Sequence, residues 1–278
     1  MTRVWRAIPG TVAVVILVAA SVVVVAPFLW MFSTSVRPSL EAYDLPPRWI
    51  PTSVTLDNYD AALNHAVPLV TQFFNSLFIA VTITVSQMIT SALAGYAFAK
   101  LRFPGRNVIF IVLLTTLMIP IQVTIIPLFI GMSQVGLVNT PWSLILPGLT
   151  HALGIFLMRQ FFISLPGELI ESAKIDGAGP FTTFRKIALP LARPALAALG
   201  VIVFLASWNN YFAPLVFLRS VETATLPLGL VLLLGPYKSG NPAVVMAGTA
   251  LAVIPALIVF LIAQRWIVES LSRSGIRG

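Results

Sequence analysis

The amino-acid sequence predicts an all-α, polytopic membrane protein with six transmembrane helices, and three observations carry this prediction. Of the 278 residues, 58% are hydrophobic and only 9% are charged, whereas about a quarter of the residues in a soluble globular domain are charged. The mean hydropathy is +0.95. Uncharged segments long enough to cross a hydrocarbon core of about 30 Å recur along the chain.

The first of these segments has to be distinguished from a cleavable signal peptide. It carries no charge over 24 residues, which is about 36 Å of helix and longer than a signal-peptide core, so we interpret it as a retained span. The last segment contains Arg265 and Trp266, which place its final turn at the membrane interface. The six spans are expected over residues 9–32, 70–99, 108–131, 141–158, 195–218 and 245–268.

Proline interrupts two of the apolar segments. Residues 225–236, TLPLGLVLLLGP, are too short to span and contain two prolines, which favours an interfacial or re-entrant segment. In the third span, Pro120 and Pro127 lie seven residues apart on one helical face, and each removes a backbone hydrogen bond. A structural kink in a crowded bundle and a gate that bends are both consistent with this pattern.

Lysine and arginine are unevenly distributed over the segments between the spans. The N-terminus, the 100–107 turn, the 159–194 loop and the C-terminal end carry 13 of the 17 basic residues, and the remaining loops carry the other four. The positive-inside rule therefore predicts that both termini and the 159–194 loop lie in the cytoplasm. The net charge of +8 is then a consequence of membrane topology, and no nucleic-acid partner is expected.

Several kinds of catalytic or metal site are disfavoured by the sequence. The phosphate-binding pattern GxxxxGK[ST] does not occur, so the chain is not expected to hydrolyse ATP. There is no cysteine, and the two histidines, His65 and His151, are far apart in sequence, so no metal site is expected. We therefore predict that the chain is not an enzyme.

A six-span channel or a secondary transporter for a small polar solute is the alternative function. No Asp or Glu lies in the predicted spans outside a last turn, which gives proton coupling little support. His151, the central ionisable residue of the fourth span, either bonds to a neighbouring helix or lines a cavity. A single NPA tripeptide at 241–243 is weak evidence for a channel, because no second copy lies between spans two and three.

The 159–194 loop is too polar to enter lipid and carries its own helical pattern. Pro166 and Pro180 each suit the start of a helix, and the sequence GAGP ends the first one. The loop is therefore expected to form a cytoplasmic helix-turn-helix between spans four and five. Its second helix carries Phe181 and Phe184, which either pack against the protein's own helices or fill a pocket on a partner.

Seven positions in this loop resemble a known motif. Membrane subunits of ABC importers carry an EAA loop with the pattern E-A-A-x3-G-x9-I-x-L-P, and six of its seven fixed positions match at the right spacing. The segments at 94–107, 207–211 and 264–278 are similar to the carbohydrate-uptake class of these subunits, specifically the maltose-importer type. The seven positions are Glu171, Ser172, Ala173, Gly177, Ile187, Leu189 and Pro190.

This resemblance implies a permease subunit of an ATP-driven importer that moves a sugar or sugar-like solute into the cytoplasm. The chain would be one transmembrane domain in the plasma (inner) membrane of a prokaryote, with residues 1–69 forming the first span and an extracytoplasmic loop, 70–268 a five-span core and 269–278 a tail. The implied partners are a homologous second permease subunit, two ATPase subunits that bind ATP and Mg, an extracytoplasmic solute-binding protein and membrane lipid. This chain itself is expected to bind no cofactor.

The resemblance also implies site residues. In the EAA loop, Ile170 stands where a further Glu is common, which removes one ionic contact to the ATPase. The residues expected at the ATPase joint are Glu171, Ser172, Ala173, Asp176, Gly177, Phe181, Phe184, Ile187, Leu189 and Pro190. The tail residues expected to contact the ATPase are Ser272, Gly275 and Arg277.

Five polar residues of the predicted spans are candidates for the path of the solute. Sugars need matching hydrogen-bond donors and acceptors, but amides and hydroxyls in membrane helices often bond to neighbouring helices instead. Both roles are open for Asn75, Gln122, Ser207, Asn209 and Asn210.

Overall fold

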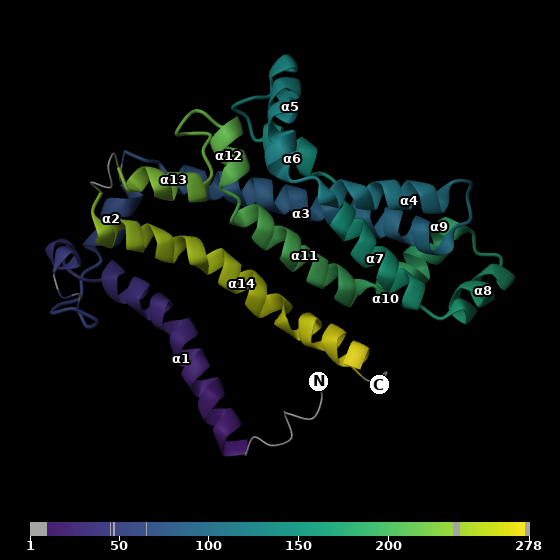
Figure 1. Ribbon diagram of the computed structural model, residues 1–278, viewed down its shortest axis with the longest axis horizontal. Coiled ribbons are helices and arrows are strands. Elements are labelled where there is room, and N and C mark those ends of the chain that lie inside the picture. Colours follow the sequence, from purple (N-terminus) through teal and green to yellow (C-terminus); the bar gives the residue numbers. More distant parts are fainter. Residues whose placement is uncertain (1–9, 45, 47, 65, 236–239, 276–278) are drawn as a thin grey trace. The chain divides into compact units, whose positions relative to one another are not determined.

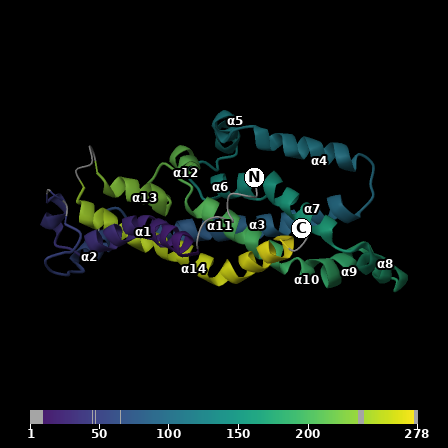
Figure 2. The ribbon, with the colours of Figure 1, turned by 60° about the horizontal axis from the view of Figure 1, so that its bottom comes forward.

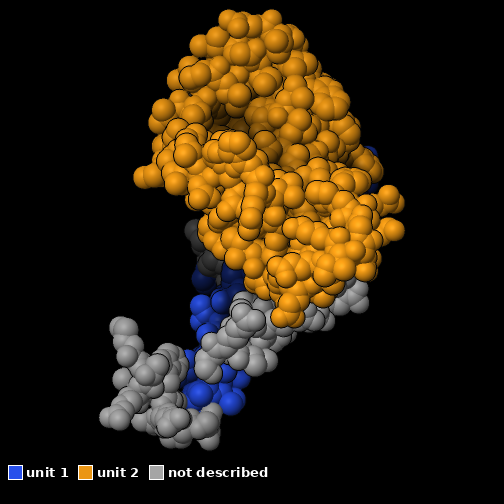
Figure 3. Space-filling view, turned by 90° about the vertical axis from the view of Figure 1, so that its right-hand side faces the viewer, with its two compact units in different colours: residues 1–69, 230–253 blue, residues 70–229, 254–278 orange. Residues whose placement is uncertain are grey.

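The structure, a computed structural model, describes residues 10–44, 46, 48–64, 66–235 and 240–275 (Figure 1). Across these residues the secondary structure is helical, with no strand, so the all-α prediction is confirmed. The chain divides into two compact units, which Figure 3 colours separately. Unit 1 comprises residues 1–69 and 230–253, and unit 2 comprises residues 70–229 and 254–278.

Unit 1 contains the first apolar helix and the polar loop that follows it. Helix α1 (Gly10–Ser35) is followed by the short helices η2 (Ser39–Tyr43) and α2 (Asp57–Leu63). None of the apolar window of α1 is buried within the chain. Its outer surface therefore suits contact with lipid or with another apolar helix.

The loop after α1 is folded around a buried arginine. The Arg37 side chain is 1% exposed, donates from Nη2 to the Arg48 carbonyl at 2.8 Å, and lies 5.0 Å from the centroid of the Trp30 ring. Asn58 is fully buried and donates to the carbonyls of Ser35 and Arg37 at 3.0 and 2.7 Å. Because these polar groups satisfy one another, the loop has a core of its own.

Unit 2 contains the EAA loop and the candidate spans between residues 69 and 217. Its helices are α3 (Leu69–Lys100), α4 (Arg106–Thr115), η3 (Thr116–Met118), α5 (Ile121–Gln134), α6 (Trp142–Gly148), α7 (Ala152–Ser164), α8 (Gly167–Ile175), α9 (Pro180–Thr183), η4 (Phe184–Ala188), α10 (Leu189–Leu191), α11 (Arg193–Trp208) and α12 (Phe212–Phe217). Helices α13 (Leu226–Leu233) and α14 (Pro242–Gly275) follow and are divided between the two units. The eight residues of α13 are about 12 Å long and cannot span a bilayer.

Several helices of the described chain have the length and composition of membrane spans, as predicted. Four of them qualify singly, and the count reaches six if each of two bent pairs is one span. The single candidates are Val12–Ser35, Leu69–Lys100, Trp142–Ser164 and Pro242–Gln264. A count of six spans stays a prediction.

The third predicted span, 108–131, differs from a single kinked helix. Its two halves, Arg106–Met118 and Ile121–Gln134, are bent by 101°. The bend lies at Pro120, whose ψ is 143°, and Ile119 before it is also extended, because a residue that precedes proline avoids the helical region. Pro127 lies inside α5 without ending it, so only one of the two prolines coincides with the bend.

The fifth predicted span, 195–218, is also divided. Helix α11 ends at Trp208 with Asn209 as its C-cap, and α12 begins at Phe212 after three intervening residues. The side-chain oxygen of Asn210 accepts a hydrogen bond from the Ala213 backbone N–H at 3.3 Å, as a capping residue does at a helix start. Asn209 therefore caps the end of α11, and Asn210, which precedes the N-cap residue Tyr211, bonds to the first turn of α12.

The core of unit 2 forms where α3, α7 and α11 lie side by side (Figures 1 and 2). A Cβ atom on Gly95 of α3 would lie 2.7 Å from Met158 Cβ and 2.9 Å from the Arg159 backbone nitrogen of α7. One turn earlier on each helix, a Cβ on Gly154 would collide with the hydroxyl of Ser91. Small residues thus let the two helices approach closely, as is common between membrane helices.

Candidate functional site

The middle of the EAA loop (residues 159–194) forms two short helical segments separated by a turn, as the sequence predicts, while residues 159–164 continue α7 and residues 193–194 begin α11. Helix α8 and the α9–η4–α10 segment lie at the end of unit 2 where α3 ends and α4 begins (Figures 1 and 2). Lys100, the last residue of α3, donates from Nζ to the Leu165 carbonyl at 3.0 Å and so connects that end to the loop. In chain order, the two helical segments lie between α7 and α11.

The turn after α8 is a Schellman motif centred on glycine. The Gly177 N–H donates to the Lys174 carbonyl at 3.0 Å, and the Ala178 N–H donates to the Ala173 carbonyl at 2.9 Å. Gly177 has φ +78°, which is the left-handed conformation that this motif requires and that glycine adopts without steric cost. A Cβ atom added there would meet nothing within 4 Å, so the space beside the turn is open.

The structure separates the two phenylalanines that the sequence treats alike. Phe184 is 7% exposed, and its ring centroid lies 5.1 Å from that of Tyr96 on α3 and 6.4 Å from that of Phe162 on α7. Phe181 is 69% exposed and Ile175, across the turn, is 85% exposed. Each of the two open interpretations thus fits one phenylalanine: Phe184 packs within the chain, and Phe181 is largely exposed on the surface.

The charged residues of the two loop segments, from Glu168 to Lys186, are exposed and form no salt bridge within the described part of the chain, whereas Arg159 at the start of the loop lies over the Phe110 ring. They include Glu171 and Asp176, together with three basic residues of the two helical segments. Exposed carboxylates beside exposed apolar side chains are suited to a partner with a basic rim and an apolar pocket.

The other motif positions lie on both sides of the loop helices. Ser172 is exposed and donates from its hydroxyl to the Leu169 carbonyl at 3.2 Å, while Pro190 is also exposed. Ala173 is buried, and Ile187 and Leu189 are half-buried. These three apolar residues therefore fasten the loop to the chain rather than face outward.

The predicted tail is described only in part. Ser272 and Gly275 lie on the last turns of α14, where the structure gives the backbone course, and Arg277 lies outside the described residues. The ATPase contacts expected of these three stay predictions.

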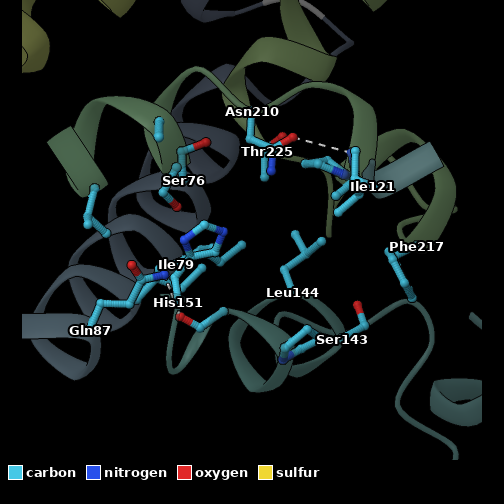
Figure 4. Close-up of a pocket in the computed structure, with 18 of the residues that line it drawn as sticks. Ser76, Ile79, Gln87, Ile121, Ser143, Leu144, His151, Asn210, Phe217 and Thr225 are labelled. Atoms are coloured by element: carbon cyan, nitrogen blue, oxygen red, sulfur yellow. Dashed lines mark hydrogen bonds between the residues drawn. The ribbon is translucent and has the colours of Figure 1, made fainter. Parts of the chain in front are cut away.

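A second feature of unit 2 is a cavity of about 320 Å³, shown in Figure 4. Side chains from α3, α5, α6, α7, α11 and α12 line it, and most of them are apolar. Among the residues that the structure describes, none of those lining the cavity is an Asp, Glu, Lys or Arg. Its polar members are Ser76, Gln87, Ser143, His151, Ser207, Asn210 and Thr225.

His151 lines this cavity and caps α7. Its Nδ1 accepts a hydrogen bond from the Leu153 backbone N–H at 3.3 Å. Of the two interpretations, the structure favours the cavity-lining role. No group of three His, Asp or Glu that could hold a metal ion occurs among the described residues.

The five path candidates are not brought together. Ser207 and Asn210 line the cavity. Asn75 instead donates to the carbonyls of Glu222 and Ala224 at 2.8 and 3.0 Å, and Asn209 donates to the Leu205 carbonyl of its own helix at 2.9 Å. Gln122 is exposed on α5 outside the lining.

Sequence reasoning did not identify the other polar residues of the cavity. Ser76, Gln87, Ser143 and Thr225 belong to apolar or turn segments in which many hydroxyls and amides occur. The sequence carries no signal for which of them face inward, because that depends on how the helices pack.

Comparisons with known proteins give a consistent result. The family model described as binding-protein-dependent transport system inner membrane component matches residues 91–273. The chain is 38% identical over 258 residues to the arabinooligosaccharides transport system permease protein AraQ of Halalkalibacterium halodurans, covering 92% of each chain. It is 34% identical over 273 residues to the sn-glycerol-3-phosphate transport system permease protein UgpE of Rhizobium meliloti, covering 96% of this chain and 97% of that one.

The structure is similar to a chain of a bacterial ABC transporter involved in the import of the acidic polysaccharide alginate. The TM-score is 0.82 at 26% sequence identity, over 92% of this chain and 95% of that chain. The similarity thus extends over nearly the whole fold.

Proposed function

Because the chain belongs to the family of binding-protein-dependent transport system inner membrane components, we propose that it is the permease subunit of an ATP-driven importer for a sugar or sugar-like solute. The EAA loop is the observation that carries this proposal. It presents exposed apolar and acidic side chains at one end of unit 2, and it joins α7 and α11, which both line the cavity. The carbohydrate class follows from the names of relatives such as the arabinooligosaccharide permease.

In this proposal the chain crosses the plasma membrane of a prokaryote six times, with both termini in the cytoplasm, as one transmembrane domain. The bent α4–α5 pair would be the third span, and α11 with α12 the fifth. Basic residues support this orientation, because Lys100, Arg106 and Arg193 lie at the ends of the helices that meet the EAA loop. That end would face the cytoplasm under the positive-inside rule.

The loop would couple the cavity to ATP hydrolysis on a partner. Two ATPase subunits bind ATP and Mg, and one of them would hold the EAA loop, while a second permease subunit and an extracytoplasmic solute-binding protein complete the importer. Movement of the loop would be passed on through Phe184 to Tyr96 and Phe162, because these three rings are in contact. The ATPase closure thereby shifts a two-state equilibrium of the permease.

The exposed residues would make the ATPase contact and the buried ones would hold the loop in place. Glu171, Ser172, Asp176, Phe181 and Pro190 are placed in the first group, and Gly177 shapes the turn between them. Ala173, Phe184, Ile187 and Leu189 form the second group. The tail residues Ser272, Gly275 and Arg277 would add a second contact to the ATPase, and Ser207 and Asn210 would line the solute path.

Reconstitution tests this function directly. The chain would be co-expressed with a second permease subunit, an ATPase and a solute-binding protein from the same organism, and ATP-dependent uptake of a labelled sugar would be measured in proteoliposomes. We expect uptake that requires both ATP inside and the binding protein outside. Uptake by the chain alone, without ATP or binding protein, would instead establish the channel or secondary-transporter alternative.

A further inference from the structure

We propose that the cavity of unit 2 is a binding site for a neutral, hydroxyl-rich solute, about one sugar ring at a time, and that it disfavours anionic solutes. This inference rests on the proposed function only in taking the bound solute to be the imported one. The volume of about 320 Å³ is at the lower end of the roughly 300–1000 Å³ typical of small-molecule sites. The cavity therefore has room for a small ligand rather than for several linked rings.

The absence of charge in the lining is the first step of the argument. The described residues that line the cavity include no Lys or Arg that could pair with a phosphate or carboxylate. His151, the one titratable group, uses Nδ1 as an acceptor. An anion placed in a largely apolar site without a counter-charge is strongly disfavoured, so a neutral solute fits this lining better.

An unpartnered hydroxyl is the second step. Thr225 is 4% exposed, it lines the cavity, and its Oγ1 has no hydrogen-bond partner within the described chain. Such a buried hydroxyl costs free energy unless a ligand or water supplies the missing partner. The cavity thus contains a group whose hydrogen-bonding capacity the fold leaves unused.

Further polar groups have hydrogen-bonding capacity left for a ligand. The Ser76 hydroxyl, which is 3% exposed, accepts a hydrogen bond from the Leu226 N–H at 2.7 Å, and this leaves its proton to donate. On His151 the Nδ1 atom accepts from the backbone, so Nε2 is the ring nitrogen left for a ligand. Asn210 accepts at its side-chain oxygen from the Ala213 N–H, and its amide group remains available as a donor.

The arrangement of these groups matches the surface of a sugar ring. In Figure 4, Asn210 and Thr225 lie along one edge of the cavity, His151 lies on a second side and Ser143 lies opposite. Apolar side chains such as Leu144 lie between them. A ring with hydroxyl groups on its rim and C–H groups on its faces meets a polar edge and an apolar surface there.

A matched pair of probes tests the charge preference. D-Galactose and D-galacturonate share one ring and differ only in a neutral hydroxymethyl against a carboxylate group. Their binding to the purified full-length chain in nanodiscs of uncharged lipid would be measured by calorimetry and by saturation-transfer NMR, with empty nanodiscs as the blank. We expect galactose to bind in the millimolar range and galacturonate to bind at least about tenfold more weakly.

The variant Thr225→Val tests the site. Valine keeps the shape and removes the unpartnered hydroxyl, so galactose affinity should fall about three- to tenfold while the thermal midpoint is unchanged or raised. Thr34→Val is the matched control, because Thr34 is also 4% exposed with an unpartnered Oγ1 but lies in unit 1. It should leave galactose binding unchanged.

Three results would overturn the inference: equal or tighter binding of galacturonate, no effect of Thr225→Val on galactose, or a cavity that binds only water and no sugar. The assay needs neither ATP nor partner subunits. Failure here would leave the importer proposal standing, and failure of ATP-dependent uptake would leave this binding result intact.

Discussion

Phe181 and Phe184 lie three residues apart with ring centroids separated by 6.4 Å, yet 69% of Phe181 is exposed and only 7% of Phe184. The inner ring belongs to the core of unit 2, and the outer ring rests on it without being covered. The second segment of the EAA loop thus connects the core of the chain with its surface.

We expect the substitutions Phe181→Ala and Phe184→Ala to affect different properties. Phe184→Ala removes a buried ring from contact with Tyr96 and should lower the free energy of unfolding by about 3–5 kcal/mol. Phe181→Ala removes an exposed ring and should change stability by less than about 0.5 kcal/mol, but it should lower sugar-stimulated ATPase activity of the assembled importer about tenfold or more. Thermal unfolding of the chain in nanodiscs and ATPase assays measure the two effects.

These two variants serve as controls for each other. If Phe181→Ala left the stimulated ATPase activity intact, the ATPase would not use this ring. If Phe181→Ala destabilised the chain as much as Phe184→Ala does, the Phe181 ring would have to be buried in the membrane-embedded protein.

Substitutions at Gly177 can distinguish the strain of its positive φ from the effect of a side chain that occupies the open space beside the turn. Its φ of +78° means that Gly177→Ala should cost about 1 kcal/mol, whereas Asn tolerates this conformation better. Because nothing within the chain lies near a Cβ there, Gly177→Asn should keep the thermal midpoint near that of the wild type. We still expect it to abolish substrate-stimulated ATP hydrolysis, since the added side chain enters the space proposed for the ATPase. If Gly177→Asn left substrate-stimulated ATP hydrolysis unchanged, the role of Gly177 would be limited to capping α8.

Gly95 sets how closely α3 and α7 approach. A side chain there would meet Met158 and the backbone of Arg159, and a backbone atom cannot move aside as a flexible side chain can. We therefore expect Gly95→Leu to destabilise the chain by about 1–3 kcal/mol or more. Gly131→Leu is the matched control, because nothing lies within 4 Å of a Cβ at that position. Equal thermal midpoints for the two variants would contradict the close packing of these helices.

Asn139 fastens the turn after α5 to the turn after α12. It has φ +63°, and its side-chain oxygen accepts from the N–H groups of Arg219 and Ser220 at 2.8 and 3.1 Å and from the Thr223 hydroxyl at 2.7 Å. Asn139→Ala loses these bonds and keeps the strained φ, so we expect a loss of about 2 kcal/mol or more. Asn139→Asp keeps the acceptor and should lose much less. The thermal midpoints of both variants measure this difference. Equal midpoints would show that the hydrogen bonds to the Asn139 side chain make no net contribution to stability.

The sequence predicted the features that depend on local pattern. Apolar length located the candidate spans, and the spacing of Pro166, Gly177 and Pro180 gave the helices of the EAA loop with their turn. Basic residues in alternate loops led to an orientation that stays a prediction. Each of these conclusions uses only neighbours along the chain.

Features that depend on packing between helices were out of reach. Phe181 and Phe184 look equivalent in sequence, and only contact with Tyr96 distinguishes them. Ile170, which stands where a Glu is common, is 7% exposed, so the structure places it away from any partner. The break at Asn209 in the fifth span was missed because a pair of amides in an apolar run reads equally well as part of a continuous helix.

The neighbouring residues Asn209 and Asn210 give a final test, because only the second lines the cavity. Asn209 bonds to its own helix at the Leu205 carbonyl, so Asn209→Ala should change the uptake of every sugar by the same factor. Asn210→Ala should alter sugar preference by about two- to tenfold, the effect of one hydrogen bond. Asn210→Ser retains a side-chain acceptor for the Ala213 N–H and loses the amide, so a shift in preference with this variant too would assign the effect to the cavity rather than to the start of α12. A changed preference in Asn209→Ala alone would place the solute path elsewhere.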